Sequence, residues 1–135
     1  MASAALEKLI VSKRANPYRP DKSIEELRAE AERRAAEPLP EGTICEIVDA
    51  DGVAAEWVLG AGATAERTFL FIHGGGYYRG SPASSRPATS RLSAATGARI
   101  LSTSYRLAPE NVFPAAIDDV YTAYRWMLNQ GVDPN

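Results

Sequence analysis

The chain has 135 residues, of which 45% are apolar and 24% charged, and a formal net charge of −2, so it is long enough for one modest domain with a buried core. This weakly acidic balance argues against a nucleic-acid partner, and no apolar stretch has the length that a bilayer span requires. A single cysteine, Cys45, excludes an internal disulfide and is compatible with a reducing cytoplasm. The alternating pattern around Cys45 predicts a buried strand thiol.

The N-terminal part of the chain predicts two helices. Residues 1–15 mix charged and apolar side chains at helical spacing, which indicates an amphipathic helix and not a secretory signal. Ser23 and Glu26 form the pattern of a capping box, so a second helix should begin there and end before Pro38. Its thin apolar stripe predicts a helix that lies over another surface as a cover, and the linker at residues 16–22 is expected to be mobile.

After these helices the apolar period changes to two, which indicates strands. Residues 43–49 and 53–59 should pair as an antiparallel hairpin through a short turn at residues 50–52, which contains Asp-Gly. Residues 68–72 form a continuous apolar run, as expected of a strand covered on both faces, and residues 99–103 form the next strand.

Two further helices are predicted between and after the last strands. The first spans residues 84–96, with Pro87 tolerated in its first turn and Gly97 ending it. The second opens at Phe113 and Pro114, and the apolar residues that share one of its faces are Ile117, Val120, Tyr121, Tyr124 and Leu128. This order of strands and helices implies an α/β fold with a leading antiparallel hairpin and a mostly parallel sheet, whose active edge lies at the carboxyl ends of the strands.

The only histidine, His73, opens a run of three glycines directly after the strand at residues 68–72. Consecutive glycines expose backbone N–H groups with no Cβ in the way, which suits the binding of an anion. A dinucleotide site fits poorly, because Arg79 stands where the third glycine of G-x-G-x-x-G should be and the next strand ends without a carboxylate. The better interpretation is an oxyanion hole, because a His-Gly-Gly-Gly run on this loop occurs in lipases and esterases.

Three motifs follow one another along the chain, namely HGGGYY at residues 73–78, YRLAPE at 105–110, and FPAA at 113–116 with Asp118 and Asp119. Their order and spacing resemble the landmarks of the hormone-sensitive-lipase-like family of α/β-hydrolase esterases, and the match covers nearly the whole chain. The two N-terminal helices resemble that family's cap. The resemblance implies a helical cap region at residues 1–40 and the N-terminal half of an α/β-hydrolase core at residues 41–135.

The resemblance also implies an activity and the residues that contribute to it. The enzyme would be a serine carboxylesterase that acts on short-chain esters by acyl transfer, with no metal or organic cofactor. The amides of Gly75 and Gly76 would donate to the oxyanion, and His73 would hold the loop through hydrogen bonds to backbone. Tyr77 and Tyr78 would be candidates to contact substrate, although aromatic residues beside a sheet edge belong equally often to the core.

The catalytic triad is missing from these residues. No serine has glycines two positions before and two after it, and there is no second histidine to serve as the base. Residues 133–135 resemble the turn that precedes the strand leading to the nucleophile elbow. We therefore expect a chain that is inactive alone and whose third strand, at residues 68–72, has an unpaired edge. That edge would recruit the C-terminal half of the hydrolase as a second chain, or a second copy; the alternative is a non-catalytic fragment that binds a partner.

The remaining polar and aromatic candidates are given structural roles. Arg106 and Glu110 are expected to form an ion pair that braces the turn behind the glycine run, because buried charges need partners. Asp118 and Asp119 lie near a helix N-terminus, where they would favour the helix dipole. Helix entry is expected for Ser81 and Ser84, and packing for Trp57 and Trp126.

Overall fold

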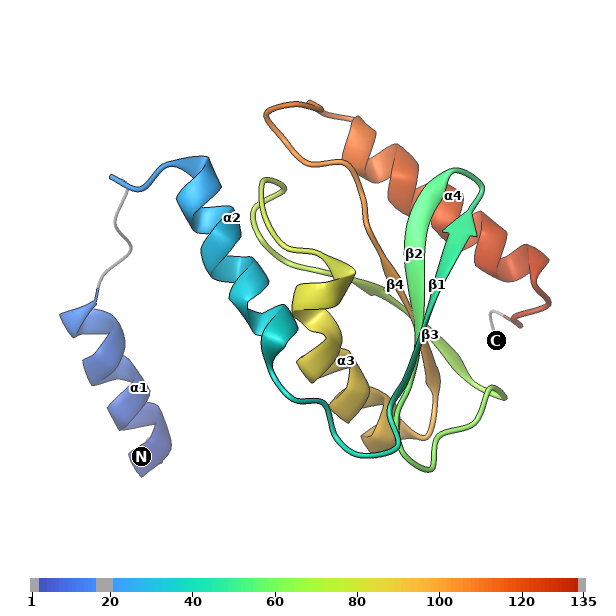
Figure 1. Ribbon diagram of the computed structural model, residues 1–135, viewed down its shortest axis with the longest axis horizontal. Coiled ribbons are helices and arrows are strands. Elements are labelled where there is room, and N and C mark those ends of the chain that lie inside the picture. The colour runs from blue at the N-terminus through green and yellow to red at the C-terminus, as the bar shows by residue number, and fades with distance from the viewer. Residues whose placement is uncertain (1–2, 17–20, 134–135) are drawn as a thin grey trace.

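The computed structural model describes residues 3–16 and 21–133. Its elements in chain order are α1 (Ala4–Ala15), α2 (Ile24–Glu32), the 3-10 turn η1 (Arg33–Ala36), β1 (Ile44–Ala50), β2 (Val53–Leu59), β3 (Thr68–Ile72), α3 (Pro82–Thr96), β4 (Arg99–Thr103) and α4 (Ala115–Asn129) (Figure 1). The α/β class is confirmed. Most of the linker predicted to be mobile, and the first two and last two residues, lie outside the described part. None of the described helices combines the length and apolar character needed to cross a membrane.

The four strands form one mixed sheet in the order β1-β2-β4-β3. β1 and β2 pair antiparallel across a two-residue turn in which Asp51 and Gly52 both have positive φ, the conformation that an Asp-Gly turn favours. The leading hairpin is therefore confirmed. β2 also pairs antiparallel with β4, so the parallel part of the sheet within the described residues is the β3–β4 pair. The sheet is therefore mixed, and the prediction of a mostly parallel sheet is wrong for these strands, because β2 continues the antiparallel pairing of the hairpin.

Helices cover both faces of this sheet (Figure 1). Successive residues of β2 face different helices, because side chains alternate along a strand. Glu56 binds Arg86 of α3, whereas Trp57 lies 6.1 Å from Trp126 of α4, measured between ring centroids. The core beside α4 is formed by Ala50, Val53, Ala55, Trp57, Leu101, Ala123 and Met127. The packing role expected for both tryptophans is confirmed.

Helix α3 begins earlier than predicted. Ser81 is its N-cap: the Ser81 hydroxyl accepts from the Ser84 amide at 3.0 Å, and the Ser84 hydroxyl accepts from the Ser81 amide at 2.9 Å. This capping box uses serine where glutamate is usual, so its signal in the sequence is weak. Pro82 takes the first helical position and Pro87 lies inside the helix, not in its first turn as expected. Gly97 ends the helix with φ 69°, as predicted.

The apolar face predicted for α4 points mainly to solvent. Ile117, Tyr121 and Tyr124 are 50%, 60% and 36% exposed, whereas the buried residues of the helix are Asp119, Ala123 and Met127. Alanine allows the helix to approach the sheet closely, and Asp119 is held inward by Arg106. Of these exposed residues, Tyr124 lines a cavity together with Phe69 and Leu70 of β3.

Strand β3 is an edge strand. It pairs only with β4 among the described residues, and Phe69 and Ile72 are 44% and 51% exposed. The unpaired edge is therefore confirmed, whereas the expectation of a strand covered on both faces is wrong for this chain. A cavity of about 800 Å³ lies between the start of β3 and the end of α4, with Leu70 and Tyr124 in its wall.

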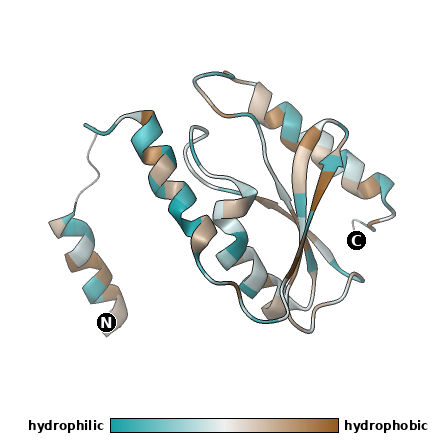
Figure 2. Ribbon diagram, viewed as in Figure 1, coloured by the Kyte–Doolittle hydropathy of each residue, from teal (hydrophilic) through white to brown (hydrophobic). Residues whose placement is uncertain are grey.

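The N-terminal helices bury few residues. α1 has none, and its apolar residues Leu6, Leu9, Ile10 and Val11 are exposed. Figure 2 shows hydrophobic and hydrophilic segments alternating along this helix. α2 begins at the predicted capping box, in which the Ser23 hydroxyl accepts from the Glu26 amide and the Glu26 carboxylate accepts from the Ser23 amide. It buries only Leu27 and continues as η1. The prediction of a thin cover is confirmed for α2, while the boundary between residues 1–40 and 41–135 stays a prediction.

Candidate functional site

The glycine loop, residues 73–80, connects the carboxyl end of β3 to α3. Gly75, Gly76 and Tyr77 have φ values of 139°, 63° and 65°. A Cβ at Gly75 would lie 2.0 Å from the Arg79 carbonyl oxygen, so no other residue fits there without moving the loop. Tyr77 is a non-glycine residue in the left-handed region, a strained conformation that often occurs at functional sites.

The amides at the centre of this loop are free to bind a ligand. The Tyr78 amide donates to the Gly75 carbonyl at 3.3 Å and closes a turn. Within the residues that the structure describes, neither the Gly75 amide nor the Gly76 amide donates to any backbone or side-chain acceptor. Unpaired backbone N–H groups in a loop of this conformation attract an anionic oxygen.

His73 holds the start of the loop. Its side chain is buried and its ring stacks on Tyr105, with centroids 4.2 Å apart. Nδ1 lies 3.0 Å from the Gly74 carbonyl oxygen and therefore donates to it, while the Tyr105 hydroxyl donates to the His73 carbonyl at 2.7 Å. Burial lowers the pKa of His73, and the hydrogen bond to Gly74 offsets this in part. A Cβ at Gly80 would lie 2.6 Å from Nδ1, so this glycine makes room for the ring.

Charged pairs around the neighbouring loop, residues 104–114, differ from the prediction. Arg106 and Glu110 do not pair with each other. Arg106 binds Asp119 with its Nη2 at 2.7 Å and its backbone amide at 2.8 Å. Glu110 accepts from Arg28 at 2.8 and 2.7 Å, and these hydrogen bonds, with one to backbone, lower the pKa of Glu110 to about 2. Asp119 is buried and pairs with Arg106, so the helix-dipole role fits the exposed Asp118 in the first turn of α4.

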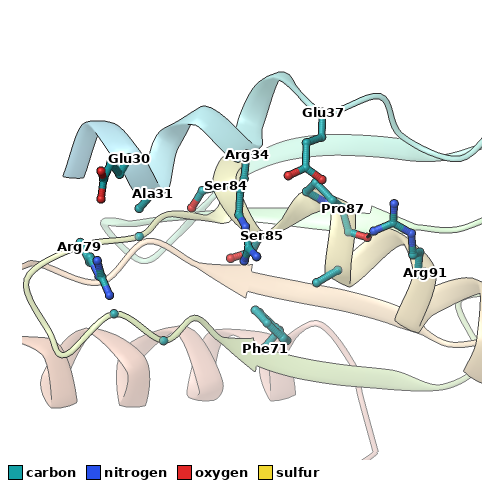
Figure 3. A pocket seen from close by; sticks show the side chains of 14 residues that line it. Glu30, Ala31, Arg34, Glu37, Phe71, Arg79, Ser84, Ser85, Pro87 and Arg91 are labelled. Atoms are coloured by element: carbon teal, nitrogen blue, oxygen red, sulfur yellow. Dashed lines mark hydrogen bonds between the residues drawn. The ribbon is translucent and has the colours of Figure 1, made fainter. Parts of the chain in front are cut away.

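Two cavities flank the glycine loop. One of about 620 Å³ lies between α2 and α3, and Arg34, Gly75 and Arg79 are among the residues that line it (Figure 3). Its walls carry several charges. The other, of about 270 Å³, is mainly apolar and is lined by Tyr77, Arg106, Ala108, Asn111, Phe113, Pro114, Ala116 and Ile117. The structure therefore places Tyr77 beside an apolar cavity, whereas the Tyr78 ring lies 5.5 Å from the Arg79 guanidinium.

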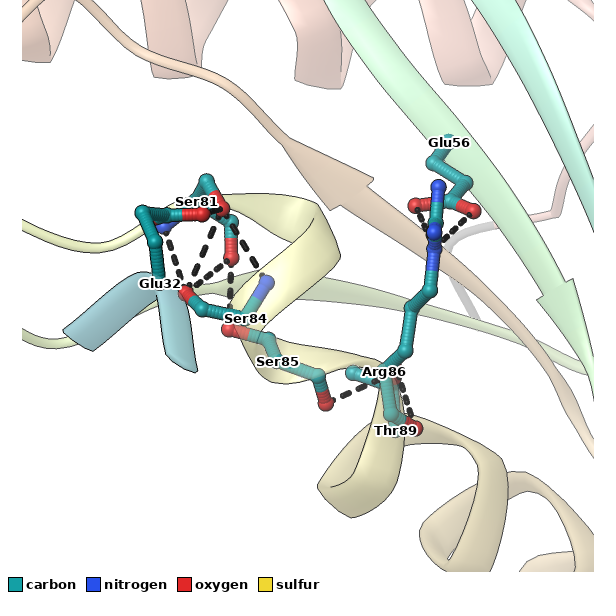
Figure 4. Close-up of polar contacts among 7 residues, drawn as sticks. All are labelled: Glu32, Glu56, Ser81, Ser84, Ser85, Arg86 and Thr89. Carbon is teal, nitrogen blue, oxygen red and sulfur yellow. Dashed lines mark hydrogen bonds and ion pairs between the residues drawn. The ribbon is translucent and has the colours of Figure 1, made fainter. Parts of the chain in front are cut away.

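Polar contacts connect α3 and its N-cap to α2 on one side and to β2 on the other (Figure 4). The Ser81 hydroxyl donates to Glu32 at the end of α2, with a distance of 2.8 Å. Arg86 donates to the buried carboxylate of Glu56 on β2, with Nε to Oε1 at 2.8 Å. The helix-entry role predicted for Ser81 is confirmed, and the structure adds a contact to α2. Across residues 3–16 and 21–133, no group of three His, Cys, Asp or Glu side chains could hold a metal ion.

Cys45 on β1 is half-buried and has a free thiol. Burial and the nearby Glu56 carboxylate raise the pKa of Cys45 to about 11. We expect iodoacetamide to alkylate it at pH 7 about 20-fold more slowly than a cysteine in a short peptide, because the smaller thiolate fraction outweighs the higher nucleophilicity of the thiolate. Intact-mass kinetics from pH 7 to 11 measure this rate. A rate equal to that of the peptide thiol would contradict the raised pKa.

Comparison with known proteins finds a matching family model, similar sequences and similar solved structures. A family model described as the alpha/beta hydrolase fold matches residues 69–135. An acetyl-hydrolase of Streptomyces hygroscopicus is 45% identical over 89 residues, which are 66% of this chain and 29% of that protein. An esterase from the bacterial hormone-sensitive lipase family superposes with a TM-score of 0.84 and 38% identity, over 99% of this chain and 46% of its own. The esterase EstE5, soaked with p-nitrophenyl butyrate, superposes at 0.85 with 36% identity, over 98% and 46%. The chain spans less than half the length of these relatives.

Proposed function

Because the chain belongs to the hormone-sensitive-lipase-like esterases of the α/β-hydrolase fold and corresponds to their N-terminal portion, we propose that it contributes the oxyanion hole and helical cap of a serine carboxylic ester hydrolase. Its only histidine is the buried His73, and it has no G-x-S-x-G sequence. The nucleophile, acid and base of the triad would come from residues outside these 135. We call the polypeptide or complex that contains both parts the complete hydrolase.

The free amides of Gly75 and Gly76 are the observation that supports this proposal. In acyl transfer a serine attacks the ester carbonyl, and negative charge develops on the carbonyl oxygen. Two backbone donors held in place beforehand stabilise this charge without reorganisation during the reaction. The loop is held at one end by His73 and Tyr105, which supports a positioning role for His73.

The substrate would be a short-chain ester. The apolar cavity of about 270 Å³ beside Tyr77 is smaller than a typical drug-sized pocket and suits a short acyl or alkyl group. Tyr77 directly follows Gly76, so the apolar group of an ester bound at the loop would be close to this cavity. Tyr78, whose ring lies near Arg79, would contact the ester at the rim of the site.

The topology of the sheet supports a partner at the β3 edge. Helix α3 connects β3 to β4 on one face, and α4 leaves β4 on the other (Figure 1). A right-handed crossover through α4 would therefore lead past β3 to its free edge, because crossovers on opposite faces run in opposite directions. A parallel strand added there would end beside the glycine loop, where a nucleophile elbow is required. We propose the C-terminal half of the hydrolase as this partner, with self-association as the second candidate.

Ester hydrolysis by the protein recovered from its own cells tests the proposal. We expect p-nitrophenyl butyrate to be hydrolysed by the complete hydrolase and not by the separated 135-residue chain. Intact mass determines whether the serine is on the same polypeptide or on a second one, and denaturing separation should remove the activity in the second case. Turnover by the separated chain that survives alanine substitution of all its serines would contradict the proposal. A partner without hydrolysis would indicate a non-catalytic assembly protein.

A further inference from the structure

Arg28 on α2 makes contacts that the proposed function does not use. Its Nε donates to the Tyr78 carbonyl at 2.7 Å, and its Nη2 donates to the Ala108 carbonyl at 2.9 Å. Nη1 and Nη2 also donate to the two carboxylate oxygens of Glu110, at 2.8 and 2.7 Å. One cap side chain therefore binds both loops that follow the parallel strands.

The two loops that Arg28 binds are also joined directly. The Ala108 amide donates to the Tyr77 carbonyl at 2.8 Å, next to the Tyr78 carbonyl that Arg28 binds. The planar guanidinium presents its donors in a fixed fork, so it can satisfy two carbonyls and a carboxylate at once. A lysine ammonium is a point charge and cannot reach these three acceptors in one conformation.

We propose that Arg28 is a positioning residue that fixes the Tyr77–Tyr78 end of the glycine loop and makes the placement of the Gly75 and Gly76 amides depend on the docking of α2. The proposal rests on the proposed function in one respect, that these amides form the oxyanion hole. α2 buries only Leu27, so little apolar area holds it and its polar contacts decide its position. A second polar contact, from Ser81 to Glu32, joins α2 to the N-cap of α3, directly after the glycine loop.

Hydrogen exchange of the 135-residue chain, followed by NMR, tests this coupling. In Arg28→Met, which keeps an unbranched apolar stem, we expect the Tyr78 and Ala108 amides to exchange at least about tenfold faster, because hydrogen bonds to a charged group that hold the loop are lost. Amides of β2 and β4 should keep their rates. Arg28→Lys should give an intermediate increase. The matched control is Arg33→Met, since the Arg33 side chain is 72% exposed and, within the part of the chain that the structure describes, pairs only with Glu30 three residues before it, at 3.4 Å.

Unchanged exchange at Tyr78 and Ala108 in Arg28→Met would overturn the proposal, as would an equal increase across β2 and β4, which indicates global destabilisation only. If Arg28→Met does not fold, Glu110→Gln keeps the shape of the partner and removes its charge, and the same two amides should accelerate by a smaller factor. This readout needs no ester hydrolysis. In the complete hydrolase, Arg28→Met should lower kcat about tenfold with KM unchanged. If the wild-type complete hydrolase has no esterase activity, the proposed function is refuted, but the exchange experiment still tests the role of Arg28.

Discussion

Alanine at Gly75 is expected to lower the kcat of the complete hydrolase by about 100- to 1,000-fold, the usual effect of losing one oxyanion donor. The added Cβ would lie 2.0 Å from the Arg79 carbonyl oxygen, and φ at this position is 139°, so the loop has to move. Such a shift turns the Gly75 and Gly76 amides away from the developing charge. Steady-state hydrolysis of p-nitrophenyl butyrate measures the effect, with circular dichroism to verify the fold.

Gly74→Ala is the matched control for this prediction. A Cβ at Gly74 has no heavy atom within 4 Å, and its φ is not in the left-handed region, so kcat should change less than about threefold. Equal loss in both variants would show that any substitution in the loop is harmful and would contradict the donor role. Retention of full activity by Gly75→Ala would remove this loop from the reaction.

Asp119→Ala should destabilise the 135-residue chain by about 2 kcal/mol, and the expected decrease in Tm is roughly 5–10 °C. The buried carboxylate accepts hydrogen bonds from two nitrogens of the Arg106 guanidinium, Nε and Nη2, and from the Arg106 backbone amide, and alanine removes the acceptor for all three donors. This expected destabilisation is smaller than the usual cost of breaking a buried ion pair, because the Arg106 side chain is 53% exposed and water can solvate it. Urea unfolding at pH 7 measures the difference in free energy of unfolding.

The neighbouring Asp118→Ala is the control, because Asp118 is exposed, and its effect on the free energy of unfolding should be within about 0.5 kcal/mol.

The pH dependence of stability is a second test of the Asp119–Arg106 pair. Burial raises the pKa of Asp119, but hydrogen bonds from Arg106 outweigh it and lower the pKa below its ordinary value. The stabilisation is thus complete above the pKa of the unfolded chain, about 3.9, and is lost as pH decreases through the lower folded value. The difference between wild type and Asp119→Ala should shrink below about pH 4; a difference independent of pH would contradict the ionised pair.

Local features of the fold could be predicted because they depend on residues a few positions apart. The capping box of Ser23 and Glu26, the Asp51–Gly52 turn and the end of α3 at Gly97 all involve backbone hydrogen bonds within one turn of the chain. The glycine loop belongs to the same group, since a strand followed by glycines is a local pattern. The start of α3 is the exception: the helix was predicted from residue 84 and begins at Pro82, because a capping box with serine at both ends carries a weak signal.

Long-range contacts of the site could not be predicted in this way. Arg106 lies four residues from Glu110, yet it binds Asp119, and Glu110 binds Arg28 from a helix at the other end of the chain. Sequence spacing gives no information on which of several carboxylates a folded chain brings to a cation. Tyr105 was visible only as part of a motif, and its stacking on the His73 ring required the parallel pairing of β3 with β4.

The amino-acid sequence alone determined the class of fold, the order of the elements and the loop whose glycines leave two amides free, because backbone conformation and capping are set by neighbouring residues. Only the tertiary structure decided which face of α4 is buried, that β3 lies at an edge with exposed apolar side chains, and that Arg28 joins α2 to the glycine loop. These depend on how sheet and helices pack. The sequence pattern alone does not distinguish the faces of α4 or the possible partners of a charged side chain. Packing does so, because Ala123 allows close approach of α4 to the sheet and because the buried charge of Asp119 must be paired.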